Sequence, residues 1–103
     1  MRQVKFRITC AGAKIPHRAH PTDAGFDLHA LRSGFILGMG WVSTGVSVLI
    51  PDGMYGRIVG RSSNIARRIR VTEGIIDAGY TGELRVHISN TGSMVYDYVA
   101  GER

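Results

Sequence analysis

The chain has 103 residues, which fits one small domain, and its 14 glycines and three prolines among short apolar runs indicate many turns and short strands. The formal net charge of +5 indicates an anionic partner such as phosphate or nucleic acid, or else a solvated basic face. The single cysteine, Cys10, excludes an internal disulfide and a Cys-x-x-Cys zinc site. No apolar run reaches membrane-spanning length and the first residues do not resemble a secretory signal, so we expect a cytoplasmic protein without a membrane partner.

Strands are indicated by alternating or short apolar segments between turn signals. They are expected over residues 4–8, 25–30, 35–37, 41–50, 55–59, 84–89 and 94–99. Gly45, inside the longest of them, indicates a bulge or a close backbone approach. The sequence predicts one helix, over residues 62–68, of two turns at most. Strands that recur about every eight to twelve residues predict an all-β sandwich or barrel in a single domain over residues 1–103.

The stretch at 73–83, EGIIDAGYTGE, has the composition of a rigid loop that carries a functional group. It holds three glycines and places Asp77 between Ile76 and Ala78, where partial desolvation would favour a general base. The alternative, which the local sequence favours, is a turn aspartate that bonds its own backbone. Tyr80 would either stack on a sugar or a base, or fill the core.

Five of the thirteen basic residues fall between residues 57 and 70. Within this cluster, Arg61 offers a planar fork of donors, and Ser62 and Ser63 stand at the predicted helix start, where backbone N–H groups are free. This arrangement suits a phosphate group, or else it is an ordinary helix cap after a surface arginine. Asp27 would join a magnesium site only with oxygen ligands from elsewhere, and is otherwise a turn or solvent residue.

The four histidines have no metal-ligand spacing. We interpret them all as structural or solvent-exposed: His17, His20, His29 and His87. The chain has no Gly-x-Gly-x-x-Gly, Walker-type or Gly-x-Ser-x-Gly motif, so the common nucleotide-binding loops and the nucleophile elbow are excluded.

Taken in order, four stretches resemble the motifs of a known family, the trimeric dUTP diphosphatases (dUTPases). They are AGFDL at 24–28, PDGMYGRI at 51–58 leading to RSS at 61–63, GIIDAGYTGE at 74–83, and GER at 101–103. The third is the most specific, and the resemblance covers essentially the whole chain. It implies a distorted jelly-roll-like β fold and a homotrimer with active sites at subunit interfaces. It also implies hydrolysis of dUTP to dUMP and pyrophosphate, with Mg²⁺ on the triphosphate, an activity that keeps uracil out of DNA.

The resemblance implies a role for each matching residue. The substrate-binding residues would be Arg61, Ser62, Ser63, Gly74, Ile75, Ile76, Tyr80 and Arg85. Of these, the Arg-Ser-Ser stretch would hold the phosphates, the backbone of residues 74–76 would read the uracil edge, and Tyr80 would pack against the deoxyribose. Asp77 would be the base that activates the attacking water, and Asp27 would contact magnesium through its water shell.

The chain departs from the family pattern in three ways. Gly60 stands where the family usually has proline, and arginines at 67, 68 and 70 make the following connection unusually basic. The family's fourth-motif glutamine, the strand that follows it and the glycine-rich fifth motif are absent from residues 1–103. We therefore expect a truncated reading frame or a fragment, in which nucleotide binding persists more readily than full activity.

Two other functions remain open. The dCTP deaminases resemble this chain in fold and in an Arg-Ser-Ser stretch, but they carry a catalytic glutamate where this chain has His87. A non-catalytic relative, or a basic β domain that binds nucleic acid, would use the cluster at 57–70. Because the aromatic residues are few, at 8%, no stacking platform for bases is expected, and we do not expect a nucleic-acid partner.

Overall fold

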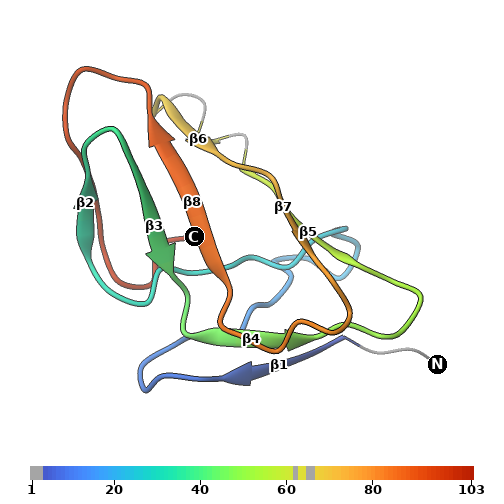
Figure 1. Cartoon of the computed structure of the whole chain (residues 1–103). Coiled ribbons are helices and arrows are strands. Elements are labelled where there is room, and N and C mark those ends of the chain that lie inside the picture. Colours follow the sequence, from blue (N-terminus) through green and yellow to red (C-terminus); the bar gives the residue numbers. More distant parts are fainter. Residues whose placement is uncertain (1–3, 62, 65–66) are drawn as a thin grey trace.

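The computed structural model describes residues 4–61, 63–64 and 67–103, and it is built from short antiparallel strands (Figure 1). Within these residues the strands are β1 (Lys5–Ile8), β2 (Gly34–Ile36), β3 (Met39–Ser43), β4 (Val46–Leu49), β5 (Gly56–Ile58), β6 (Ile69–Val71), β7 (Gly74–Ile76), β8 (Arg85–Asn90) and β9 (Tyr96–Tyr98). One sheet has the order β3-β8-β6, and three further pairs are β1-β4, β2-β9 and β5-β7. The all-β class expected from the sequence is confirmed.

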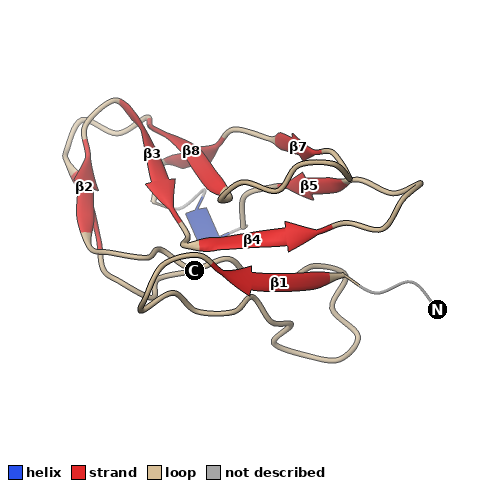
Figure 2. Cartoon of the chain, turned by 60° about the horizontal axis from the view of Figure 1, so that its bottom comes forward, coloured by secondary structure: helices blue, strands red, loops and turns tan. Residues whose placement is uncertain are grey.

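The sheets face one another across an interior, as Figure 2 shows. The β1-β4 pair forms one side of the molecule, the β3-β8-β6 sheet and the β5-β7 pair form the other, and β2 stands at one end. Strands far apart in the sequence become neighbours, since β1 pairs with β4 and β2 pairs with β9. Within the described residues, no helix is long and apolar enough to cross a membrane.

The core consists of two small clusters. The first is Val46, Val48, Ile50, Ile76 and Leu84, and the second is Ile36, Ile69 and Ile88. Side chains from both clusters line a hollow of about 420 Å³ in the interior, most of whose walls are apolar. The hollow opens to the surface, since the exposed Tyr55 and Val59 are also among its lining residues.

Most expected strands are confirmed, with shifted ends, as β1, β2, β5, β8 and β9. The single strand expected over 41–50 is wrong, because β3 ends before Thr44 and pairs with β8, whereas β4 pairs with β1. Gly45 lies at the break with a φ of 72°, and a Cβ there would lie 2.8 Å from that of Ala13. The close backbone approach expected at this glycine is therefore confirmed.

The strand expected over 25–30 is wrong. Asp27 forms only an isolated bridge with His17. A few residues later, the N–H of Ala30 donates instead to the carbonyl of Glu102, at 2.8 Å. Because successive residues bond to different parts of the chain, no single neighbour runs alongside to make a strand.

Only part of the helix expected over 62–68 can be compared, because residues 62 and 65–66 lie outside the described ones. Ser63 and Asn64 are helical. The chain then turns and enters β6 and β7, two strands that alternation did not predict. Each is three residues long, and β7 lies in the stretch that the sequence indicated as a loop.

The buried His29 is one of the few polar side chains in the interior, with 6% of its surface exposed. Its ring stacks on that of His17 with centroids 5.5 Å apart, and its Nδ1 has no hydrogen-bond partner among the described residues. Burial lowers the pKa of His29 from its ordinary value of 6.5, and the positive charges of His17, Lys14 and Arg103 act in the same direction, against the carboxylate of Asp27. His29 is thus a structural histidine that the fold keeps neutral.

We predict that Thr44→Val destabilises the fold by about 1–3 kcal/mol. Thr44 is 2% exposed and its hydroxyl donates to the carbonyl of Leu84 at 2.7 Å, so the isosteric valine removes a shielded hydrogen bond. Urea denaturation measures the loss. Thr22→Val, at an exposed loop position, is the matched control and should change stability by less than about 0.5 kcal/mol. Equal losses in both variants would contradict the role given to the Thr44 hydroxyl.

We also predict that the free energy of unfolding falls as the pH drops below 6.5. Because the folded-state pKa of His29 is lowered, the unfolded chain takes up the proton first, and protonation favours unfolding. His29→Asn removes this group and should flatten the decline between about pH 7.5 and about pH 5.5. His20→Asn, at an exposed site, is the control and should leave the slope as in the parent. An unchanged slope in His29→Asn would contradict the prediction.

Candidate functional site

The loop between β7 and β8 closes on itself. The carbonyl of Asp77 accepts a hydrogen bond from the N–H of Tyr80 at 3.0 Å. The Tyr80 hydroxyl then donates to the carbonyl of Glu83 at 2.8 Å, which lays the ring across the loop. A Cβ at Gly82 would lie 2.6 Å from the Tyr80 hydroxyl oxygen, so a larger residue there would displace the ring. The loop expected at 73–83 is therefore present over residues 77–83, whereas residues 74–76 form β7.

This loop is anchored to the core at both ends. Ile76 is buried in the first core cluster, and Ala78 packs against the same cluster. At the other end, the Glu83 carboxylate accepts from the N–H of Gly45 at 2.9 Å, beside the buried Leu84. The loop thus presents its middle residues from a fixed frame.

The side chain of Asp77 faces solvent in the single chain. The desolvation expected from Ile76 and Ala78 does not occur here, because these neighbours turn toward the core. Among the described residues, no ion pair or hydrogen bond occupies the Asp77 carboxylate. It is free to contact a water molecule.

Strand β7 provides one paired and one free edge. Residues 74–76 pair with β5, with Ile75 opposite Arg57, and in the described part of the chain no strand lies on the other edge. A free strand edge presents backbone N–H and C=O groups to a ligand. Ile75 itself is 59% exposed.

Asp27 lies in the irregular segment between β1 and β2, where its backbone N–H donates to the carbonyl of His17 at 2.8 Å. Its carboxylate pairs with the guanidinium of Arg103 at 2.9 Å, and its side chain is 22% exposed. Asp27 is thus a partly buried, paired residue and not simply the solvent residue that the sequence alternatively indicated. Sequence reasoning missed Arg103 as its partner, although the GER stretch at 101–103 had been noted.

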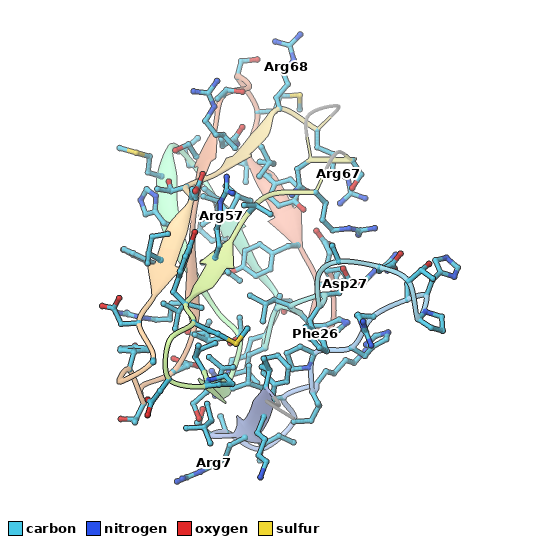
Figure 3. All side chains as sticks on the ribbon, turned by 90° about the vertical axis from the view of Figure 1, so that its right-hand side faces the viewer. Arg7, Phe26, Asp27, Arg57, Arg67 and Arg68 are labelled. Carbon is cyan, nitrogen blue, oxygen red and sulfur yellow. The ribbon has the colours of Figure 1, made fainter. Side chains whose placement is uncertain are left out.

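The predicted residues fall into two groups. Asp27 and Arg61 line the interior hollow, together with Arg103, whereas Asp77 and Tyr80 are not among its lining residues (Figure 3 shows the side of the molecule that carries Asp27). We call the residues at 74–80 the loop group, and Asp27 with residues 61–63 the phosphate-binding group. In the single chain, Ile76 of the loop group lines this hollow, but Asp77 and Tyr80 do not.

Two further residues that the resemblance implies for substrate binding are Ser62 and Arg85. Ser62 lies outside the described residues, although Ser63 beside it is exposed. Arg85 is exposed on β8, and its guanidinium lies 5.3 Å from the centroid of the Trp41 ring. This cation–π contact holds Arg85 on the exposed face of the β3-β8-β6 sheet.

The described residues contain no cluster of three or more histidine, cysteine, aspartate or glutamate side chains that could hold a metal ion. Arg103 takes one oxygen of the Asp27 carboxylate, which leaves the other for a hydrated ion. Mg²⁺ keeps several waters and shares one or two carboxylates with substrate phosphates. The residues present therefore fit a contact through water, and do not form a closed cage.

Comparison with known proteins identifies relatives along nearly the whole chain. A family model described as dUTPase matches residues 11–103. The deoxyuridine 5'-triphosphate nucleotidohydrolase of Saccharomyces cerevisiae is 34% identical over 103 residues, which are 97% of this chain and 70% of the relative. The protein of the same name from Leifsonia xyli subsp. xyli is 42% identical and is matched over 93% of this chain and 67% of its own length.

Solved structures agree with this match. A mutant dUTPase from phage phi11 of S. aureus, in which a structural Mg(II) ion is coordinated, has a TM-score of 0.81 at 32% identity, covering 86% of this chain and 60% of that one. A mutant dUTPase of Staphylococcus bacteriophage 80alpha with dUpNHpp has a TM-score of 0.92 at 25% identity, covering 100% of this chain and 79% of its own. The jelly-roll-like fold implied by the four motifs is thereby confirmed. This chain belongs to the dUTPase family.

Proposed function

We propose that residues 1–103 form a single domain that carries nucleotide-binding and catalytic residues for the hydrolysis of dUTP to dUMP and pyrophosphate, and so helps to keep uracil out of DNA. The match of the dUTPase family over residues 11–103 carries this proposal. The rigid loop around the free carboxylate of Asp77 supports it. The free thiol of Cys10 suits a reducing compartment, so we place the activity in the cytoplasm.

In this reaction, Asp77 accepts a proton from a water molecule whose oxygen attacks the α-phosphorus of dUTP. The bond from the α-phosphorus to the oxygen that bridges it to the β-phosphorus breaks, and pyrophosphate leaves with that oxygen and its electron pair. A general base must be both unpaired and fixed in place. The exposed carboxylate on an anchored loop meets both requirements.

The loop group supplies recognition of the nucleoside. The free edge of β7 at residues 74–76 would read the uracil edge through backbone groups, which distinguish donors from acceptors. The ring of Tyr80 is 46% exposed and is fixed by its bond to Glu83, so it would pack against the deoxyribose as a rigid wall. A ribose 2′-hydroxyl would collide with such a wall, which favours a deoxynucleotide.

Arg61 of the phosphate-binding group supplies a charge opposite in sign to that of the triphosphate. Arg61, with Ser62 and Ser63, would hold the triphosphate through charge-assisted hydrogen bonds. Asp27, oriented by its ion pair with Arg103, would contact Mg²⁺ through water. When bound, Mg²⁺ supplies charge neutralisation on the triphosphate.

A homotrimer would bring the loop group of one subunit to the phosphate-binding group of the next. The absence of Asp77 and Tyr80 from the hollow that Asp27 and Arg61 line in the single chain supports this arrangement. So does a series of large apolar side chains exposed on and next to β2 and β3. These are Phe35, Leu37, Met39 and Trp41, each more than half exposed, at 68%, 69%, 71% and 58%. Exposed apolar residues of this density are typical of a surface that another subunit covers.

The deaminase alternative is not favoured. The site that would hold its catalytic glutamate is occupied by His87, whose Nδ1 lies 2.8 Å from the hydroxyl of Thr72 and whose ring packs against Trp41. The named relatives are nucleotidohydrolases.

We predict that Asp77→Asn lowers the rate of pyrophosphate release from dUTP by about 10²–10⁴-fold while leaving the affinity for a non-hydrolysable dUTP analogue nearly unchanged. The amide keeps the shape of the side chain but does not accept a proton from water. Asp97→Asn, an exposed position on β9, is the matched control and should retain full activity. A parallel loss of analogue binding in Asp77→Asn would exclude Asp77 as the base.

A second prediction tests the shared site. Asp77→Asn and Arg61→Gln should each be inactive alone, whereas subunits of the two variants, unfolded and refolded together, should regain activity. Random assortment gives about a quarter of the sites an intact loop group from one subunit and an intact phosphate-binding group from another. The activity of the mixture relative to the parent protein is measured. A mixture as inactive as its components would show that both groups serve a site within one chain.

A further inference from the structure

The arginines at 57–70 differ in how they are neutralised. Arg57 pairs with Glu73 at 2.6 Å, and Arg67 pairs with Glu102 at 3.2 Å. The other three, Arg61, Arg68 and Arg70, form no ion pair among the described residues. These three line one surface hollow, together with Gly60, Asn64, Ile69, Val71 and Thr91. The described lining of this hollow thus includes three arginines and no aspartate or glutamate.

The backbone holds Arg68 in an unusual conformation. Its φ of 61° makes Arg68 the one non-glycine residue in the left-handed region among those described. The turn is secured by Thr91, whose N–H and hydroxyl both donate to the Arg68 carbonyl, at 2.9 and 2.7 Å. A strained residue that the surrounding structure fixes in place points to a function for its side chain.

The basic hollow adjoins the interior hollow. Arg61 and Asn64 line both, and so do Ile69 and Val71. Figure 3 shows Arg68 at the top of the molecule, with Arg67 and then Asp27 below it. A chain of phosphates held at Arg61 could therefore extend from the side of Asp27 toward Arg68.

We propose that Arg68 and Arg70 form, beside Arg61, an anion site that binds inorganic pyrophosphate and the terminal phosphates of a nucleoside triphosphate. Linear polyphosphate is the matching ligand because several phosphates in a row carry the charge that three guanidinium groups neutralise, and each guanidinium offers a fork of donors. The described lining of this hollow contains no aromatic side chain on which a nucleobase could stack, so a nucleic acid strand fits it less well. The assignment to a dUTP tail and its pyrophosphate product rests on the function proposed above.

Calorimetric titration of inorganic pyrophosphate into the purified chain tests this site. Arg68→Gly and Arg70→Gln should each weaken pyrophosphate binding about tenfold, as expected for losing a charge-assisted hydrogen bond, and should leave dUMP binding unchanged. Glycine is chosen at position 68 because it adopts a φ of 61° without strain, so this variant keeps its fold. Arg7→Gln, which removes one exposed arginine on β1 at the opposite end of the molecule in Figure 3, is the control for net charge.

Arg7→Gln should bind pyrophosphate as the parent does. An equal loss in this control, or a loss of thymidine oligonucleotide binding as large as that of pyrophosphate, would overturn the proposal. A chain that binds pyrophosphate through Arg68 and Arg70 but releases none from dUTP would refute the hydrolase function and keep this site. A chain that hydrolyses dUTP, with pyrophosphate binding unaffected by either substitution, would keep the function and refute the site.

Discussion

The fold depends on the junction between the β3-β4 turn and the start of β8. The hydroxyl of Thr44 donates to the carbonyl of Leu84 at 2.7 Å, and the N–H of Leu84 donates to the carbonyl of Val46 at 2.8 Å. The N–H of Gly45 adds a bond to the Glu83 carboxylate at 2.9 Å. Because Thr44 and Val46 are almost fully buried, a lost partner here would leave a polar group without water to replace it. One junction thus ties the β1-β4 pair to the sheet that contains β8.

The position of the candidate base follows from this junction. The loop that carries Asp77 starts at the buried Ile76 and ends at Glu83 and Leu84, so both of its ends are fixed by the core. Between them, the bond from Tyr80 to the Glu83 carbonyl keeps the loop compact. The carboxylate therefore needs no bond of its own to be held in place, and it can stay free for water. A base that the fold positions, with its own oxygens unoccupied, is suited to catalysis by proximity.

Alternation along the sequence was enough to predict β1 and β8, because each has one face toward the interior. It failed for 25–30, where Leu28 packs on the core and His29 is buried while Phe26 is 44% exposed, so the apolar phase did not mark the inner face. It also failed for 41–50, since composition does not reveal that the two halves of a β-rich segment pair with different strands. Asp77 was a candidate from its local sequence, which favoured a turn aspartate, and the resemblance of its motif implied its role as base. The pairing of Asp27 with Arg103 joins residues far apart in the sequence, and only the fold brings them together.

The distribution of charge gives a physical reason for the site that we propose to be divided between subunits. Carboxylates near the basic cluster are paired, as in the contact of Arg57 with Glu73, and such exposed pairs contribute little to stability. If Asp77 stood beside Arg61 in the same chain, the two would form an ion pair, and the base would lose its freedom to take a proton from water. In the described part of the single chain neither residue has an ion pair, so the carboxylate is free and Arg61 is available for an anion. A substrate with an uncharged nucleobase at one end and a polyphosphate at the other can then span both groups. Its phosphates neutralise Arg61, which would otherwise attract the Asp77 carboxylate.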